Sequence, residues 1–517
     1  MGQGRKYDVV VIGAGVGGLV CANYLVRMGK KVLLLEHGKS VGGNISGFRR
    51  RGFFFDAGSQ STENVGILFP ILEELGIFNP EDWERADWRW VTPDCDVVLR
   101  DFSQVRADFK ACFPESSRDI DAWFDFLEPG CRLMVEMLGE HPFPLVKRGA
   151  EKLRLTARVF RLGLPLTGTM PRTLRIPGSE LARRIFRDPR LAFLFGEFGD
   201  SNMLLFMHYS FWYSFLHDYV YPKGGLVSLA ESLARSFQEH GGELRTSCTV
   251  DRILTEGDLA VGVETREGER YRAEKVVNTG NPRRLVSVMC DPALFPRRFR
   301  SVMENGPVSI SVITAFLGLD IPDRELEGYL KTHHVIHWRT YGAQEDVYDP
   351  DLHRKRWAMI SWCSRHDKTL APPGKNSIII QIPMPYDWLN GWGTGSSDPC
   401  VRNEEYWRLK EKVLKEVISD TERIVPGLGS RVECSDLATP RTLARFTLNP
   451  RGSIMGWSYD MYRTPLFGRF ARFTTPVKNL YLAGHYSIWP GGIVFSALSG
   501  KLVAQGIYEG FRRVLLW

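Results

Sequence analysis

Residues 7–37 read YDVVVIGAGVGGLVCANYLVRMGKKVLLLEH, and this stretch decides the fold. The short apolar run Val9–Ile12 is typical of a strand buried on both faces of a parallel sheet. Three glycines then complete the motif G-x-G-x-x-G, at Gly13, Gly15 and Gly18. Such a turn, between a buried strand and the start of a helix, is where a dinucleotide places its pyrophosphate.

Each glycine of the motif has its own physical task. Gly13 permits the tight turn, Gly15 lets the backbone approach a pyrophosphate, and Gly18 allows the helix to pack closely on the strand. A second strand is expected at 32–35. Glu36 follows it, 18 residues after Gly18, where an acidic side chain can bond ribose hydroxyls. Together these features predict a dinucleotide site, and so far they favour NAD and FAD equally.

The chain of 517 residues is too long for one core, so two or more domains are expected. Its composition, 44% hydrophobic and 25% charged, is that of an ordinary globular protein. The first strand is expected almost at Met1, so we expect no signal peptide. Nine cysteines without any C-x-x-C pair favour reduced thiols. A cytoplasmic location is therefore expected.

Positive charge is concentrated between Lys147 and Arg190. This window holds twelve Lys and Arg residues against three acidic ones, so its balance of +9 exceeds the net charge of the chain, +7. Arginines alternate with leucines and other apolar residues, as they do in a surface that rests on anionic lipid. Peripheral binding to a membrane surface is the leading interpretation, and a solvated basic face is the alternative. Nucleic acid is disfavoured because no reader module accompanies the charge.

Two short segments after Glu36 extend the nucleotide-binding unit. Gly42 and Gly43 form a glycine pair in the loop after the second strand, and Asn44 follows them. The segment GFFFDAGS at 52–59 predicts an aromatic strand that ends in a turn. Because the loop lies beside the dinucleotide, the glycine pair could contact the rest of a longer cofactor.

Residues 61–220 have a different character, with helical patterns, many aromatic residues and several prolines, and they predict a largely helical insertion. Seventeen residues without a formal charge, SNMLLFMHYSFWYSFLH, lie between Asp200 and Asp218. Their polar residues make a poor transmembrane helix. A buried core helix, the lining of an apolar tunnel and a shallow dip into a membrane interface remain open as interpretations.

The remainder returns to the first domain twice. A helix at 226–240 and short strands between 244 and 278 lead to a second insertion at 281–450, for which we expect an antiparallel sheet backed by helices. Three histidines there, His333, His334 and His337, have no acidic or cysteine partner nearby in the sequence, so we expect no metal site. The closing segment, 479–517, is again strand, glycine turn and helix.

This order resembles the two-dinucleotide-binding flavoprotein fold, and within it the family of phytoene desaturases, carotenoid cis–trans isomerases and retinol saturases. The resemblance is carried by IGAGVGGLVCANYL, LLLEHGKSVGGN, GFFFDAGS, YPKGGLVSLAESLARSFQEHGGELRT, VDRILTEGDLAVGVETREGERYRAEKVVNTGNP and NLYLAGHYSIWPGGIVFSALSGKLVA. It implies FAD as the cofactor. It covers the insertions poorly, and it does not single out one reaction.

The resemblance also implies which residues hold FAD. The first three glycines sit under the pyrophosphate, Glu36 bonds the adenosine ribose, and Val250 lies beside the adenine. The segment 484–492 approaches the ribityl chain and the flavin. The full cofactor-binding set is Gly13, Gly15, Val16, Gly17, Gly18, Glu36, Gly42, Gly43, Asn44, Val250, Gly484, His485, Gly491, Gly492 and Ile493. This chain departs from the family pattern at two positions. It has Asn44 where many members have Arg, and His485 where many members have Asp.

A helix that begins near Gly492 has an independent physical reason to lie at the flavin. Its N-terminal dipole and free N–H groups would stabilise the anion of the reduced flavin. The predicted class is therefore α/β, with a Rossmann-like FAD-binding domain that is discontinuous in sequence and an inserted α+β substrate domain. The expected parts are 1–90, 222–290 and 450–517 for FAD, 91–221 for a helical, membrane-facing insertion, and 291–449 for the rest of the substrate domain.

The leading functional hypothesis is an FAD-dependent oxidoreductase that acts on carbon–carbon bonds of a lipophilic polyene or isoprenoid. Desaturation, saturation and reduced-flavin cis–trans isomerisation all remain open. No second G-x-G-x-x-G opens a helix, so electrons are expected to pass through oxygen, a quinone, a partner protein or direct reduction. An amine-oxidase-like enzyme and a non-enzymatic prenyl-binding escort protein are the alternatives. Candidates for the flavin-facing catalytic end are Tyr221, Lys223, His485 and Trp489.

Overall fold

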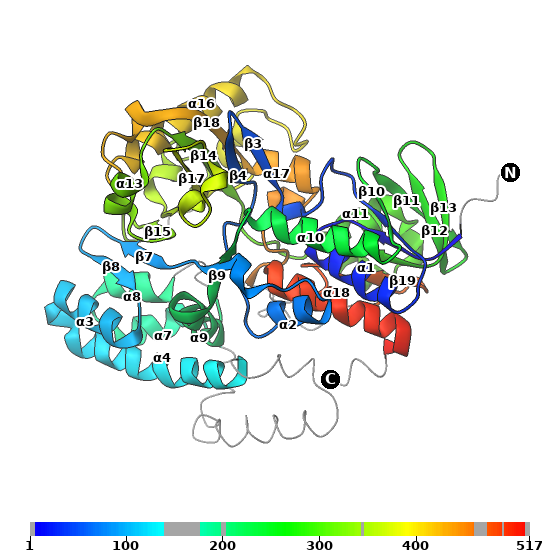
Figure 1. Cartoon of the computed structure of the whole chain (residues 1–517), viewed down its shortest axis with the longest axis horizontal. Helices are drawn as coiled ribbons and strands as arrows, with labels where there is room; N and C mark the ends of the chain where they lie inside the picture. The colour runs from blue at the N-terminus through cyan, green and yellow to red at the C-terminus, as the bar shows by residue number, and fades with distance from the viewer. Residues whose placement is uncertain are drawn as a thin grey trace.

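The computed structural model describes residues 6–138, 176–197, 203–342, 346–459, 473–488 and 491–511. In it the N-terminal motif belongs to a mostly parallel sheet (Figure 1). Its strands run in the order β10 (Glu243–Arg245), β2 (Val32–Leu35), β1 (Lys6–Ile12), β13 (Arg270–Asn278), β12 (Leu259–Thr265) and β11 (Val250–Glu256), and β19 (Leu480–Leu482) pairs with β13. The strands β10, β2, β1, β13 and β19 are parallel, whereas β11 and β12 form an antiparallel hairpin. Three distant parts of the chain thus build one sheet.

Both faces of this first sheet are covered, which explains the continuous apolar run in β1. Val9 and Val11 pack toward α1 (Val16–Arg27), α10 (Leu226–Glu239) and α18 (Gly492–Glu509), which lie together on one side (Figure 1). Val10 packs on the opposite side, in a second cluster that includes β11, β12 and α12 (Arg297–Asn305). A strand between two apolar layers has no polar face.

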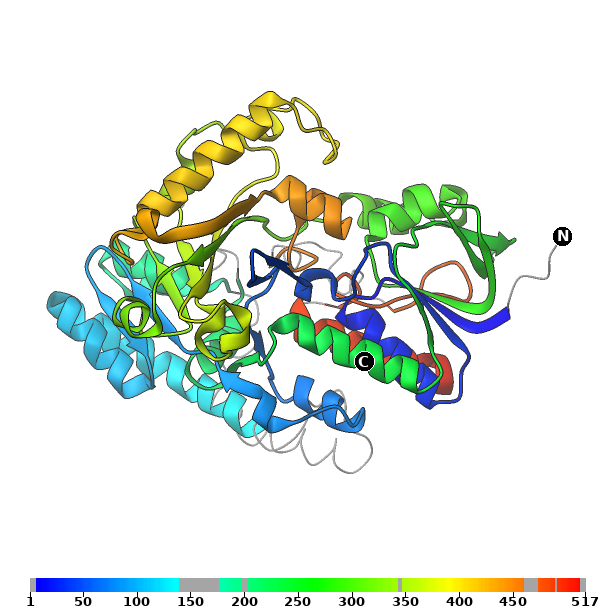
Figure 2. The ribbon, with the colours of Figure 1, turned by 45° about the horizontal axis from the view of Figure 1, so that its top comes forward.

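The second sheet belongs to the insertions. It runs β18 (Val432–Ala438), β14 (Val312–Leu319), β17 (Asn376–Pro383), β16 (Ala358–Ser361), β15 (His334–His337), β7 (Trp88–Val91) and β8 (Asp96–Leu99). All neighbours are antiparallel except β15 and β7. On its outer side lie α13 (Asp323–Leu330) and the long α16 (Glu404–Thr421), as Figures 1 and 2 show. These layers confirm the predicted α/β class with an inserted α+β domain.

A helical layer lies beside the second sheet. It contains α3 (Phe102–Cys112), α4 (Ser117–Leu138), α7 (Gly178–Ile185), α8 (Pro189–Gly196) and α9 (Leu205–Tyr213), with α2 (Leu68–Glu74) nearer the first sheet (Figure 1). Two small sheets connect the parts, one formed by β3 (Gly47–Arg50) and β4 (Phe53–Asp56). The other has the order β5 (Thr62–Glu63), β9 (Tyr219–Pro222) and β6 (Trp83–Arg85).

The expectation of a largely helical segment at 61–220 missed five strands, of which β7 and β8 extend the second sheet. Arg89 in β7 is buried, and its guanidinium donates to Asp96 of β8 and to the carbonyl oxygens of Tyr329 and Leu330. A buried, paired arginine breaks the apolar pattern by which a strand is recognised. Among the short strands expected between 244 and 278, β10 and β11 follow one another in the sequence but lie at opposite ends of the sheet order.

Candidate functional site

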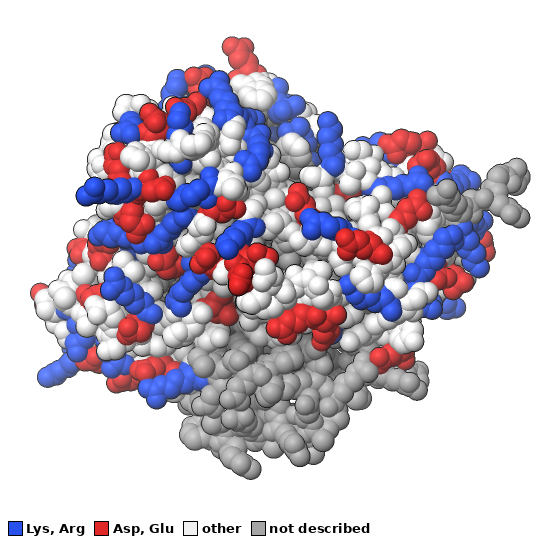
Figure 3. All heavy atoms as spheres, viewed as in Figure 1, with Lys and Arg blue, Asp and Glu red and all other residues white. Residues whose placement is uncertain are grey.

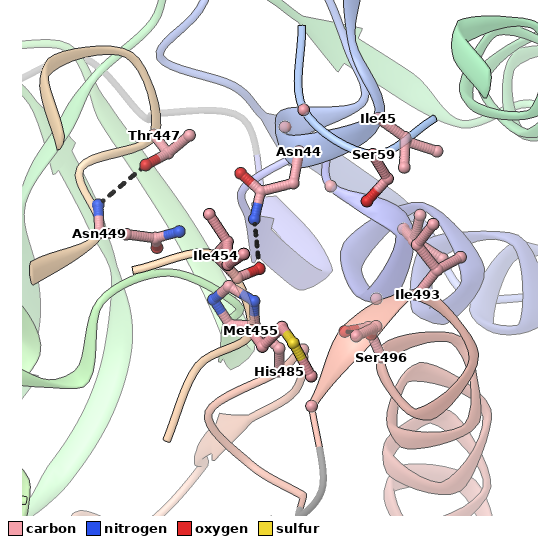
Figure 4. A pocket seen from close by; sticks show the side chains of 18 of the residues that line it. Asn44, Ile45, Ser59, Thr447, Asn449, Ile454, Met455, His485, Ile493 and Ser496 are labelled. Atoms are coloured by element: carbon pink, nitrogen blue, oxygen red, sulfur yellow. Dashed lines mark hydrogen bonds between the residues drawn. The ribbon is translucent and has the colours of Figure 1, made fainter. Parts of the chain in front are cut away.

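A cavity of about 440 Å³ lies where the carboxyl ends of β1 and β2 meet the insertions (Figure 4). The carboxyl edge of a parallel sheet is the usual place for a dinucleotide. Fourteen predicted cofactor residues line this cavity: Gly13, Gly15, Val16, Gly17, Glu36, Gly42, Gly43, Asn44, Val250, Gly484, His485, Gly491, Gly492 and Ile493. The fold therefore gathers residues from four separate segments of the chain around one space.

Gly15 and Gly18 are glycines for different reasons. The backbone of Gly15 has φ −73° and ψ 174°, which any residue adopts, and a Cβ placed on it would meet no atom within 4 Å. Gly15 borders the cavity, so the absent side chain leaves room for a ligand. A Cβ on Gly18 would lie 1.9 Å from the carbonyl oxygen of Gly13, so helix and turn could not approach as they do. Gly18 itself does not line the cavity.

Glu36 directly follows β2, and both oxygens of its side chain accept hydrogen bonds from backbone N–H groups. Its Oε2 accepts a hydrogen bond of 2.7 Å from the N–H of Ala14, and its Oε1 accepts one of 2.7 Å from Gly38. These bonds hold the glycine-rich turn and the loop after β2 in place. Each carboxylate oxygen has a second lone pair, so Glu36 can still accept a hydrogen bond from a ribose hydroxyl in the cavity.

Two helices begin at the cavity, α1 after Gly15 and α18 after Gly491. Neither helix has an acidic residue in its first turn. The N-terminus of a helix carries a partial positive charge and free N–H groups, which attract an anion. The two N-termini and the open space at Gly15 therefore fit a cofactor with a pyrophosphate and a ring that becomes anionic. The protein fits FAD in this respect.

The two residues that depart from the family pattern also lie at the cavity (Figure 4). Asn44 Nδ2 donates a hydrogen bond of 3.0 Å to the carbonyl oxygen of Ile454, so its side chain fastens the loop 449–455 to the glycine pair. Burial lowers the pKa of His485 to about 4, so its imidazole is neutral at physiological pH. A neutral imidazole can donate from one nitrogen and accept at the other.

The other catalytic candidates are placed differently. The hydroxyl of Tyr221 donates a hydrogen bond of 2.5 Å to Asp56 Oδ2, and the side chain is fully buried outside the cavity lining. Lys223 is exposed, and its backbone N–H donates to the carbonyl oxygen of Asp82. Neither residue lines the cavity. Trp489 lies outside the described residues.

The uncharged stretch 201–217 contains both cavity-lining residues and core residues, so two of its three interpretations apply to different side chains. Met207, Ser210, Phe211 and Ser214 line the part of the cavity formed by α9 and the residue that follows it, which we call the apolar end. Other side chains of the same stretch pack in the core, among them Trp212. Within the described ranges, no helix combines the length and the apolar character needed to cross a membrane.

Sequence reasoning missed several lining segments. They are 59–65, 278–284 and 443–455, together with Trp88, Met359 and Gln381. Two of these parts carried a signal through the family resemblance: Ser59, at the end of GFFFDAGS, and 278–281, within VVNTGNP. His333 and His334 are fully buried and His337 nearly so, and the described residues contain no cluster of His, Cys, Asp and Glu suited to a metal ion.

Comparisons with known proteins agree with this geometry. Residues 16–508 match the family model described as flavin containing amine oxidoreductase. The all-trans-retinol 13,14-reductase of Danio rerio is 26% identical over 97% of this chain and 85% of that protein. The chloroplastic prolycopene isomerase of Daucus carota is 24% identical over 98% and 81%.

Solved structures share the fold at lower identity. An oxidoreductase from Methanosarcina mazei has a TM-score of 0.60 and 17% identity, covering 97% of this chain and 100% of that one. A triple mutant of putrescine oxidase has a TM-score of 0.62 and 14% identity, covering 98% and 99%. At such identities the likeness establishes the fold.

Proposed function

This chain belongs to the family of flavin-containing amine oxidoreductases and is an FAD-dependent oxidoreductase, and we propose that its substrate is a lipophilic polyene, changed at its carbon–carbon bonds. The observation that carries the proposal is that one cavity joins the dinucleotide cradle to an apolar end built by α9. The retinol reductase and prolycopene isomerase relatives, both named for polyenes, extend over nearly the whole chain and support it.

The proposal assigns a task to each part of the cavity. Gly13, Gly15 and the start of α1 would hold the pyrophosphate, and Glu36 would orient the ribose. Bound FAD would exchange a hydride, with its two electrons, with the substrate. The protein would hold the substrate in position and exclude water from the site. Met207 and Phe211 would hold the polyene by apolar contact. Reducing equivalents would come from or go to oxygen, a quinone or a protein partner.

An assay of the purified, yellow protein tests the substrate class. All-trans-retinol, prolycopene and phytoene are each supplied in detergent, with the flavin either oxidised or reduced by dithionite, and the products are separated by chromatography. We expect one of these polyenes to be desaturated, saturated or isomerised. Conversion of none of them, with peroxide formed from an amine, would favour the amine-oxidase alternative. A colourless protein that takes up no FAD would favour the escort alternative.

We also propose that the protein rests on an anionic membrane surface through residues 147–190. Most of this window lies outside the described residues, so the support is its sequence of alternating arginines and apolar residues. On the face drawn in Figure 3, by contrast, positive and negative side chains are interspersed over the described surface. A window with a charge balance of +9 stands out against such a mixed surface.

Vesicle flotation tests the surface proposal with a matched pair of variants. Each basic residue near an anionic membrane contributes about 1 kcal/mol, so Arg154→Gln with Arg158→Gln is expected to weaken binding to phosphatidylserine vesicles about 30-fold. Arg297→Gln with Arg298→Gln, two exposed arginines of α12, removes the same charge elsewhere and is expected to leave binding unchanged. Equal loss in both double variants would contradict the location that we propose.

A further inference from the structure

A carboxyl group lines the apolar end of the cavity. Glu63 belongs to β5, which pairs with β9 so that Thr62 faces Val220 and Glu63 faces Tyr219. Successive residues of a strand point to opposite sides. Thr62 is fully buried on one side, whereas Glu63 and Tyr219 both line the cavity, where Val65, Phe211 and Ser214 are also found.

The surroundings of Glu63 favour a protonated carboxyl group. Burial raises its pKa, and the Tyr219 hydroxyl, which donates to the carboxyl, offsets this only in part. None of the ion pairs formed among the described residues includes Glu63. Burial without a paired cation among the described residues shifts the carboxyl toward its protonated form.

A buried acid, Asp218, lies next to the half-buried Glu63. Burial raises the pKa of Asp218 to about 7. Asp218 Oδ2 accepts hydrogen bonds from the backbone N–H groups of Asn64 and Val65, at 3.0 and 2.6 Å, but the residue does not line the cavity. Arg85, the cation that faces Asp218, donates to the carbonyl oxygens of Phe215 and Leu216. Of the two acids, Glu63 alone faces the substrate side.

Few other described residues of the cavity lining could exchange a proton with a substrate. The ionisable lining residues are Glu36, His37, Glu63, Tyr219, Cys248, Arg284, Tyr459 and His485. Glu36, His37 and Cys248 lie at the dinucleotide end, next to β2 and β11. The catalytic candidates Tyr221 and Lys223 are outside the lining. A group that gives or takes a proton must reach the reacting atom, and Glu63 borders the space that we propose for the polyene.

We propose that Glu63 exchanges a proton with the polyene, at the carbon next to the one that exchanges a hydride with the flavin. This rests on the proposed function. In saturation the π bond is lost, one carbon receives a hydride with two electrons from the reduced flavin, and its neighbour receives the proton of the Glu63 carboxyl, which then regains one from solvent. Desaturation runs in reverse: Glu63 first releases its own proton to solvent, both C–H bonds then break, a hydride goes to the oxidised flavin, and Glu63 takes up the other hydrogen as a proton.

Infrared spectroscopy tests the protonation of Glu63 without turnover. At pH 7, the difference between the wild-type and Glu63→Gln spectra is expected to contain a carboxylic acid C=O band that shifts in D2O and again when retinol is added. Glutamine keeps an oxygen that can accept from Tyr219, so the variant is expected to fold and keep its flavin. Bands of an ionised carboxylate, or a band that retinol leaves unchanged, would overturn the proposal.

Turnover of all-trans-retinol by dithionite-reduced protein provides the second measurement. General acid–base catalysis contributes about 10²- to 10⁴-fold, so Glu63→Gln is expected to be slower by at least about 100-fold with flavin content unchanged. Asp218→Asn keeps its acceptor oxygen for Asn64 and Val65, and the wild-type rate is expected within about threefold. Full activity of Glu63→Gln would overturn the assignment of Glu63.

Failure of the proposed function and misfolding of the Glu63→Gln variant can each be distinguished from failure of the Glu63 proposal. If wild-type protein converts no polyene, the proposed function fails, and the infrared band with its response to retinol still decides the state of Glu63. If Glu63→Gln does not fold, Tyr219→Phe replaces it. Loss of the tyrosine donor is expected to move the Glu63 C=O band to higher frequency while the rate stays within about tenfold. An unmoved band in Tyr219→Phe would overturn the proposed contact.

Discussion

Gly15→Ala is expected to give a folded protein that has lost most of its flavin. Backbone angles at Gly15 suit alanine, and the new methyl group would meet no protein atom within 4 Å. It would occupy the space at the start of α1 that a pyrophosphate needs. Overpacking of this kind costs about 1–3 kcal/mol, which weakens FAD binding by roughly 10- to 100-fold. The flavin-to-protein absorbance ratio and a titration of the apoprotein with FAD measure the loss.

Gly18→Ala is the matched control, with the same added methyl group three residues later. Its Cβ would lie 1.9 Å from the Gly13 carbonyl oxygen and 3.3 Å from Thr279 Oγ1, so turn and helix must separate. We expect the variant either to be insoluble or to have a free energy of unfolding at least about 3 kcal/mol lower than that of the wild type. Should Gly15→Ala unfold as Gly18→Ala does, or keep its full flavin content, the distinction between ligand space and packing would be wrong.

Glu36→Ala is expected to have the second large effect, because it lowers both the stability of the protein and its affinity for the cofactor. The N–H groups of Ala14 and Gly38 would lose their acceptor, and each unsatisfied donor costs about 1–3 kcal/mol. The bond proposed for the ribose would be lost as well. We expect lower thermal stability and FAD affinity reduced by about 100-fold, measured by thermal melting with and without FAD and by flavin titration.

Glu274→Ala is the control for removing a carboxylate from the same sheet. Glu274 is half exposed and pairs with the exposed Lys6, and such surface pairs contribute about 0–1 kcal/mol. Neither stability nor flavin content is expected to change measurably. Unchanged flavin occupancy in Glu36→Ala would refute the ribose assignment, even if the melting temperature fell.

The first 37 residues were predictable because their contacts are local. In β1, α1 and β2, the apolar run, the glycine spacing and Glu36 meet within one strand–helix–strand unit, so spacing along the chain reports their arrangement in space. The closing strand and α18 were recognisable by the same pattern. Identification of FAD rather than NAD needed more than this unit, since both cofactors share the pyrophosphate that the glycines accommodate.

The substrate end of the cavity could not be predicted in this way. Glu63 and Tyr219 are 156 positions apart and meet only because β5 pairs with β9. Tyr221 follows Tyr219 by two residues, yet its hydroxyl is bound to Asp56, outside the cavity. Local patterns therefore determined the cofactor cradle, whereas long-range strand pairing decided which polar groups face the substrate, because pairing partners so distant leave no periodic signal in the sequence.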